Sequence, residues 1–233
     1  MATGRSPAQK PVSAGGSVPS EPRAQAWQVA EQIRQMIVRG ALAPGVHLSQ
    51  ADLAETFGVS RFPVREALKL LAAETIVVHD LNRGFFVAAL SSSEARQLYC
   101  LRKLVETELF EGLIWPGAQQ LKGLEALLTE LVKRSQNPRR SDWVHLHGEF
   151  QKAIIRFSDQ DVVVREAERL WTLTERYRSF LPYDINDPAP MKRRREIFDA
   201  LRSQDRRKLI ISVDLGRQEA LAAVLASLES RGL

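Results

Sequence analysis

The sequence is poor in cysteine, in histidine and in long apolar runs. Cys100 is the single cysteine among 233 residues, so no disulfide can form within the chain, and the sequence is compatible with a reducing cytoplasm. A lone cysteine of this kind is expected to be a small buried hydrophobe. No apolar run approaches the roughly 18 to 20 residues that a membrane-spanning helix needs, which predicts a soluble, cytoplasmic protein.

Familiar catalytic motifs are also missing. The chain has no HExxH zinc motif, no GxSxG nucleophile turn and no glycine-rich phosphate loop, and it holds only four histidines. We therefore predict that the protein is not an enzyme. A metal-dependent enzyme built on the C-terminal helices is the less favoured alternative.

Composition and periodicity divide the chain into three parts. Residues 1–22 are rich in Gly, Pro, Ser and Ala, which predicts a disordered tail. Residues 23–90 combine short helices with β-prone runs. Residues 91–233 follow a polar break at Ser91–Ser93 and show helical periodicity without a convincing strand, which predicts an all-α bundle. The predicted fold class is mainly α, with one small β-hairpin.

Residues 49–87 have the pattern of a winged helix-turn-helix. Ser49 is a good N-cap for a short helix that Gly58 can end, and Ser60 is placed to cap a second helix. The β-prone runs 76–79 and 85–87 then predict a hairpin, which would form the wing.

Apolar stripes at helical spacing predict which faces are buried. A helix over residues 24–39 is expected to pack behind the helix-turn-helix, with Trp27, Ala30, Ile33 and Ile37 on its buried side. The first helix after the break carries Leu98, Leu101, Val105 and Leu109 on one side. In the last helix, the stripe from Leu209 to Leu228 could serve either the core or a dimer partner.

Cations on the second helix of the motif indicate nucleic-acid binding. Arg61, Arg65 and Lys69 recur every four residues and form a basic stripe opposite the apolar face, while Arg83 lies at the tip of the wing. Residues 24–90 hold six Lys or Arg and six acids, so the arrangement of the cations and not their total supports DNA binding.

The runs Val59–Leu68 and Arg83–Val87 resemble the signature of the GntR family of bacterial transcription regulators. That resemblance implies DNA contacts by Arg61, Arg65 and Gly84. Phe62 occupies a place that is commonly Thr, so a hydroxyl contact is exchanged for an apolar surface that suits a thymine methyl. The full set predicted to contact DNA is Ser49, Ser60, Arg61, Phe62, Arg65, Lys69, Arg83 and Gly84.

The helical part resembles the FCD effector domain of the FadR-like subgroup, in part through Tyr99, Arg102 and Glu106. Most FCD domains hold a divalent metal through an Asp or Asn and three His. The corresponding positions here are His147, Gln151, Arg194 and Gly216. Because Gln is a weak ligand, Arg repels a metal and Gly has no side chain, we predict no tightly bound metal. An alignment shifted by one turn would bring in Asp142 or His145.

An arginine can take over the task of a missing metal, because guanidinium clamps carboxylate or phosphate groups. We therefore expect a small anionic effector to bind between Arg102, His147, Gln151 and Arg194. Two simpler readings stay open: Arg102 pairs with Glu106 alone, or Arg194 belongs to a solvated run from Lys192 to Arg195.

These observations predict a dimeric, ligand-responsive transcription regulator that binds a short palindromic operator in double-stranded DNA, most simply as a repressor. The alternative is an effector-blind dimeric DNA-binding protein whose pocket has degenerated. The residues do not decide between them.

Overall fold

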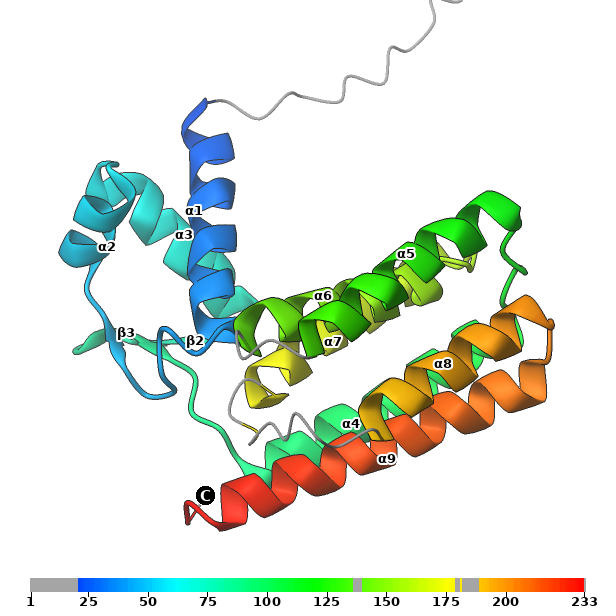
Figure 1. Cartoon of the computed structure of the whole chain (residues 1–233). Coiled ribbons are helices and arrows are strands. Elements are labelled where there is room, and N and C mark those ends of the chain that lie inside the picture. The colour runs from blue at the N-terminus through cyan, green and yellow to red at the C-terminus, as the bar shows by residue number, and fades with distance from the viewer. Residues whose placement is uncertain (1–20, 136–139, 179–180, 182–188, 233) are drawn as a thin grey trace, which may run out of the picture.

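A computed structural model describes residues 21–135, 140–178, 181 and 189–232, and it has two parts (Figure 1). The first part, which we call the head, contains three helices and a small sheet. The second part, the bundle, is entirely helical in the described residues. The predicted tail, residues 1–22, lies outside the described part except for its last two residues, which begin the first helix.

The head is a winged helix-turn-helix, as the sequence predicts. Its elements are α1 (Glu21–Val38), β1 (His47–Leu48), α2 (Gln50–Phe57), α3 (Arg61–Ala73), β2 (Val77–Asp80) and β3 (Gly84–Val87). The sheet has the order β1-β3-β2 with antiparallel pairs. The two-residue strand β1 was not predicted, because a strand of that length has no periodicity and exists only through its pairing with Phe85 and Phe86.

Local capping explains why α2 and α3 begin and end where they do. The Ser49 hydroxyl accepts a hydrogen bond from the Asp52 N–H at 3.3 Å, and Gly58 has a φ of 64°, a left-handed conformation that closes α2. Both features confirm the prediction. Ser60 is the N-cap residue of α3, but its hydroxyl makes no capping hydrogen bond, so the predicted capping role of that side chain is wrong.

The bundle consists of six helices in the described residues: α4 (Ser92–Glu111), α5 (Ala118–Ser135), α6 (Arg140–Ile155), α7 (Asp161–Arg178), α8 (Ala189–Arg202) and α9 (Arg206–Glu229). The helices α4 and α9 lie along each other at the bottom of the view in Figure 1, with α8 beside them and α5, α6 and α7 above. None of the described helices is both long and apolar enough to cross a membrane.

The core runs without a break from the head into the bundle. Ile33 of α1 and Leu68 of α3 belong to the same buried cluster as Leu170 and Tyr177 of α7 and Val224 of α9. The helices α1 and α7 are in contact. A change in the position of α7 would therefore change the packing of the head against the bundle.

Three burial predictions are wrong. Trp27 is 49% exposed, Leu101 is 45% exposed, and Cys100 lies on the surface. In α1, Ala30, Ile33 and Ile37 supply the buried face, and Trp27 lies at its edge. In α4, buried charged residues take the place that the apolar stripe was expected to fill, so Cys100 and Leu101 face outward.

Candidate functional site

The outer face of α3 presents the predicted basic stripe. Arg61, Arg65 and Lys69 are exposed, whereas Val64, Leu68 and Leu71 on the opposite face are fully buried. A helix so oriented leaves its cations available to the edges and phosphates of a duplex groove. Phe62 is 53% exposed on the same surface, with the Arg65 guanidinium carbon 5.6 Å from its ring centroid. The apolar contact predicted for Phe62 is therefore sterically open.

One acid lies among these cations. Glu66 receives a hydrogen bond from Lys69 Nζ at 3.0 Å and lies 3.6 Å from Arg65 Nε, and the bond from Lys69 lowers its pKa below the usual value. The carboxylate therefore stays ionised and holds both cations on one side of α3. Such exposed pairs are weak, so both side chains can leave Glu66 for a phosphate.

The tip of the wing is built around Asp80 and Gly84. The Asp80 carboxylate accepts hydrogen bonds from the backbone N–H groups of Asn82 and Arg83, which fixes the turn. Gly84 has a φ of 90°, and a Cβ there would lie 3.2 Å from the His47 ring, so glycine is required at this position. Arg83 lies in the turn between β2 and β3, where it is exposed and its guanidinium carbon lies 5.0 Å from the ring centroid of Phe86. Ser49 lies at the start of α2 and Ser60 at the start of α3.

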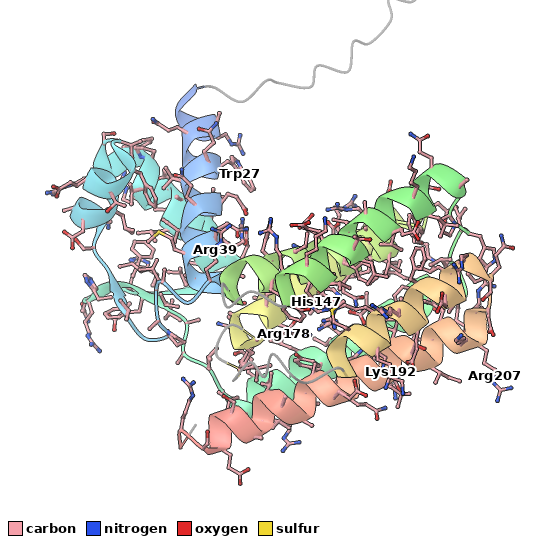
Figure 2. The ribbon with its side chains drawn as sticks, viewed as in Figure 1. Trp27, Arg39, His147, Arg178, Lys192 and Arg207 are labelled. Carbon is pink, nitrogen blue, oxygen red and sulfur yellow. The ribbon has the colours of Figure 1, made fainter. Side chains whose placement is uncertain are left out.

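A second site lies inside the bundle. A cavity of about 330 Å³ opens between α4, α6, α7, α8 and α9. All four residues predicted to bind an effector, Arg102, His147, Gln151 and Arg194, line it. Figure 2 shows His147 and Arg178 in the interior of the bundle, where both also line this cavity.

Three further arginines line the cavity: Arg178 from α7, Arg193 from α8 and Arg217 from α9. These three arginines could not be predicted from the sequence. The spacing of residues along one helix does not show which faces of α4, α7, α8 and α9 line a common cavity. Among the described residues of its lining, five are arginines and one, Glu219, is an acid, so this part of the lining carries an excess of positive charge. A volume of this size suits a small metabolite.

Arg102 both pairs with Glu106 and lines the cavity, so the simpler reading and the effector reading are compatible. Arg102 Nε donates to Glu106 Oε1 at 2.8 Å, and Arg217 Nε donates to Glu106 Oε2 at 3.1 Å. All three side chains are buried. Arg102 also donates to the Thr174 hydroxyl at 3.1 Å and lies 3.6 Å above the Trp171 ring. This network holds the guanidinium groups of α4 and α9 in fixed positions.

Arg194 is not part of a solvated run. It is 4% exposed, whereas Lys192 and Arg195 on either side of it are exposed, and its guanidinium carbon lies 4.8 Å from the ring centroid of Trp143. Stacking on an aromatic ring fixes the position of the guanidinium plane. Arg194 therefore brings a positioned cation to the cavity wall.

His147 is held between two tryptophans, with ring centroids 5.4 Å from Trp143 and 5.6 Å from Trp171. Burial lowers the pKa of His147 well below its usual value, and the nearby Arg194, Arg178 and Arg102 lower it further. The imidazole is therefore neutral near pH 7 and offers one donor and one acceptor to a ligand.

The residues in this cavity do not fit a tightly bound divalent metal. His147, Gln151, Arg194 and Gly216 occupy the positions implied for metal ligands and all line the cavity, but only His147 is a strong donor among them. Within the described residues, no group of three or more His, Cys, Asp or Glu could hold a metal ion. His145 is not in the lining, and the side chain of Asp142 lies outside the described part.

Comparisons with known proteins assign families to both parts. The profile of the family described as bacterial regulatory proteins, gntR family, matches residues 25–87, and that of the FCD domain matches residues 97–209. The chain is 36% identical to the gluconate operon transcriptional repressor of Bacillus subtilis over 58% of this chain and 56% of that protein. The chain spans between 51% and 59% of the length of three Bacillus proteins that it matches.

A relative with wider coverage comes from Streptomyces ambofaciens. This uncharacterised HTH-type transcriptional regulator in an unstable DNA locus is 30% identical over 75% of this chain and 74% of its own length. Among solved structures, McbR/YncC of Escherichia coli superposes with a TM-score of 0.76 over 88% of this chain and 98% of that chain. Its sequence identity is 22%, so it supports the fold alone.

Proposed function

This chain belongs to the GntR family of bacterial regulatory proteins and carries an FCD domain, and on that premise we propose that it is a transcription regulator that binds operator DNA through α3 and the wing. The observation that carries the proposal is the outer face of α3, where Arg61, Arg65 and Lys69 are exposed above a fully buried apolar face. Arginines at the start of such a helix can pair with guanine edges, while Lys69 and Arg83 suit phosphates.

The experiment measures binding to the duplex upstream of the protein's own gene by fluorescence anisotropy. We expect the double variant Arg61→Ala/Arg65→Ala to bind about 100-fold more weakly or worse, because each bidentate base contact is worth about 1–3 kcal/mol. The matched control is Lys122→Ala/Lys133→Ala, which removes two exposed cations from α5 and should bind like the parent. Parental affinity in the arginine variant would refute the proposal.

We also propose that the regulator acts as a homodimer, because two heads read a palindrome more selectively than one. An exposed apolar surface on the bundle supports this: Leu101 and Leu104 on α4, and Ile211 and Leu215 on α9, are between 39% and 64% exposed on two helices that pack side by side. Sedimentation equilibrium should give twice the chain mass for the parent and the chain mass for Leu104→Asp/Ile211→Asp.

For the bundle, we propose a small anionic effector that binds in the cavity without a tightly bound metal. Its support is the lining, in which Arg194 lies where the family would place a metal ligand and three further arginines accompany Arg102. His147, neutral and beside them, can donate to an oxyanion. The name of the Bacillus relative, a repressor, favours a mode in which the effector releases DNA.

Thermal unfolding in the presence of millimolar citrate, malate, gluconate or inorganic phosphate tests this proposal. A ligand that binds the folded state raises the melting temperature. We expect at least one of these anions to do so for the parent, and we expect Arg194→Ala to abolish the shift. Arg195→Ala, which removes the exposed neighbour on the same helix, should keep it.

The effector-blind reading makes the opposite prediction. If none of these anions stabilises the parent, or if Arg194→Ala and Arg195→Ala respond alike, the cavity serves only to pack the bundle. No catalytic role is proposed, because the fold and the relatives are those of transcription regulators.

A further inference from the structure

The last turn of α7 contacts three separate regions of the protein. Glu175 faces a second cavity, of about 390 Å³, that lies between the head and the bundle. Arg176 and Tyr177 are bonded to the start of α4, and Arg178 lines the arginine-rich cavity described above. Four consecutive residues point in different directions on a helix, so one turn can reach all three regions.

The α7 residues in the lining of the arginine-rich cavity are Trp171 and Arg178, and Thr174, one turn before Arg178, lies on the same side of the helix. The Thr174 hydroxyl is buried and accepts the hydrogen bond from Arg102 Nη1 at 3.1 Å. An anion that draws Arg102 or Arg178 toward itself therefore pulls on the last turn of α7 at two points. Buried charged side chains do not move independently of the backbone that carries them, because the interior is closely packed.

The opposite side of this turn holds the connection between the two parts of the protein. Only residues 88–91 separate the wing from α4. Arg176 Nη2 donates to Glu94 Oε1 at 2.6 Å, and the Tyr177 hydroxyl donates to the other oxygen of the same carboxylate. The Tyr177 oxygen also lies 3.4 Å from the Ser91 carbonyl and 3.5 Å from the Ser91 N–H.

Two of these side chains are buried, whereas Ser91 and Glu94 are only half-buried. Arg176 and Tyr177 are each 2% exposed, and Ser91 is the N-cap of α4, where its hydroxyl accepts from the Glu94 N–H. Burial and the bond to Glu94 raise the pKa of Tyr177, so the phenol stays protonated and remains a donor at any physiological pH. We call the contacts of Arg176 and Tyr177 with Ser91 and Glu94 the linker clasp.

The head rests on the same turn. Leu173 and Tyr177 pack in the buried cluster that includes Ile33 of α1 and Val77 of β2. Glu175 lies under the head in the second cavity, whose wall also includes Arg34 and Glu74. A small rotation or displacement of this turn would therefore weaken the linker clasp and, at the same time, the packing of α7 against α1.

We infer that the last turn of α7 couples the arginine-rich cavity to the head: a ligand that engages Arg178 and Arg102 opens the linker clasp and frees the head to reorient. This inference rests on the proposed effector site, and it specifies which contacts transmit ligand binding from that site to the head. In this scheme Arg176, Tyr177 and Glu94 are positioning residues and touch neither ligand nor DNA. The structure shows the clasped arrangement, which is the one that would hold both heads in fixed positions.

The test compares two arginines of the same cavity by amide hydrogen exchange over residues 88–94. Arg178 belongs to the last turn of α7, whereas Arg193 lies on α8, where it pairs with Glu196 and Glu219. We expect Arg178→Ala to speed exchange over residues 88–94 at least fivefold, as Tyr177→Phe and Glu94→Gln should do directly. Arg193→Ala should stay within twofold of the parent.

Peptides from α5 report whether a variant is merely unstable, because their exchange should not change in any of the four proteins. If Arg178→Ala does not fold, Arg178→Gln provides the same comparison. Unchanged exchange over residues 88–94 in the Arg178 variant, or an equal increase in Arg193→Ala, would overturn the proposal. The measurement uses neither DNA nor effector, so such a failure leaves the tests of the proposed function standing.

Discussion

The head and the bundle place their charged residues in opposite environments. In the head, the cations that we assign to DNA binding are exposed, and no described polar or charged residue of the head is buried. Among the described residues of the bundle, ten polar or charged ones are buried, including Arg102, Glu106, Arg194 and Arg217. A DNA duplex is too large to enter the protein and can be bound only by exposed residues, whereas a small ligand can be bound in an enclosed cavity.

This difference has an energetic consequence. An exposed cation can be removed with little effect on folding, while a buried ion pair cannot lose one member without leaving the other charge desolvated. Substitution of the exposed cations of the head should therefore change DNA binding without changing stability. Substitution of the buried charges of the bundle should change ligand binding and stability together. The three predictions below test that contrast, from the largest expected effect to the smallest.

Glu106→Gln should have the largest effect, because Glu106 is the carboxylate shared by Arg102 and Arg217. Without its charge, two buried guanidinium groups lose their common counter-ion, and we expect the free energy of unfolding to fall by about 3–5 kcal/mol. Urea denaturation measures this value. Glu108→Gln, at an exposed position on the same helix, serves as the control and should change it by less than about 0.5 kcal/mol. Similar values for the two variants would contradict the contrast.

Glu175→Gln should have an intermediate effect that depends on pH. Burial raises the pKa of Glu175 to about 7, although Lys152 nearby opposes the shift, and Oε1 packs so closely on α6 that a Cβ at Gly148 would collide with it. Since the pKa in the folded state exceeds the ordinary 4.5, folding favours the protonated form. The resulting stabilisation is complete below the ordinary pKa and is lost as pH rises through about 7.

Glutamine resembles the protonated carboxyl at every pH, so the variant should gain on the parent as pH rises from 5 to 8. We expect a difference of about 3 kcal/mol at pH 8 and of only about 1 kcal/mol at pH 5. Titration of His147 occurs in both proteins and cancels in the comparison. Urea denaturation at each pH gives the difference, and Glu125→Gln on the surface of α5 should show no such trend. A difference that does not vary with pH would mean that Glu175 is ionised throughout.

Arg61→Ala should have the smallest effect on stability. Arg61 is exposed at the first position of α3, so its removal should change the free energy of unfolding by less than about 0.5 kcal/mol while DNA binding falls. Circular dichroism during thermal unfolding, combined with anisotropy on the same samples, measures both. A large loss of stability would show that the stripe on α3 also supports the fold.

The head could be predicted almost completely from local patterns. Ser49 and Gly58 set the ends of α2 through contacts within a few residues, and the alternation of Val64, Leu68 and Leu71 with the cations set the orientation of α3. The strand β1 is the element of the described head that was not predicted, because it is a strand only through its pairing with β3, almost forty residues further along the chain. Trp27 was wrongly placed because the stripe on α1 is narrower than its apolar composition indicates.

In the bundle, local patterns indicated helices and the resemblance indicated which positions form a cavity. They did not indicate that Arg178 and Arg217 join Arg102 and Arg194, or that Arg194 is buried while Lys192 and Arg195 are exposed. The periodicity of a helix shows which residues share a face, but it does not show which helix that face will meet.

The sequence by itself determined the succession of elements in the head and the exposed basic stripe on α3, because each depends on residue type and on neighbours within one or two turns. Only the tertiary structure decided that five arginines surround one cavity and that the last turn of α7 touches the cavity, the linker and the head. These contacts join residues as far apart as Ser91 and Tyr177, and such distances are closed by packing of the whole chain and by nothing local.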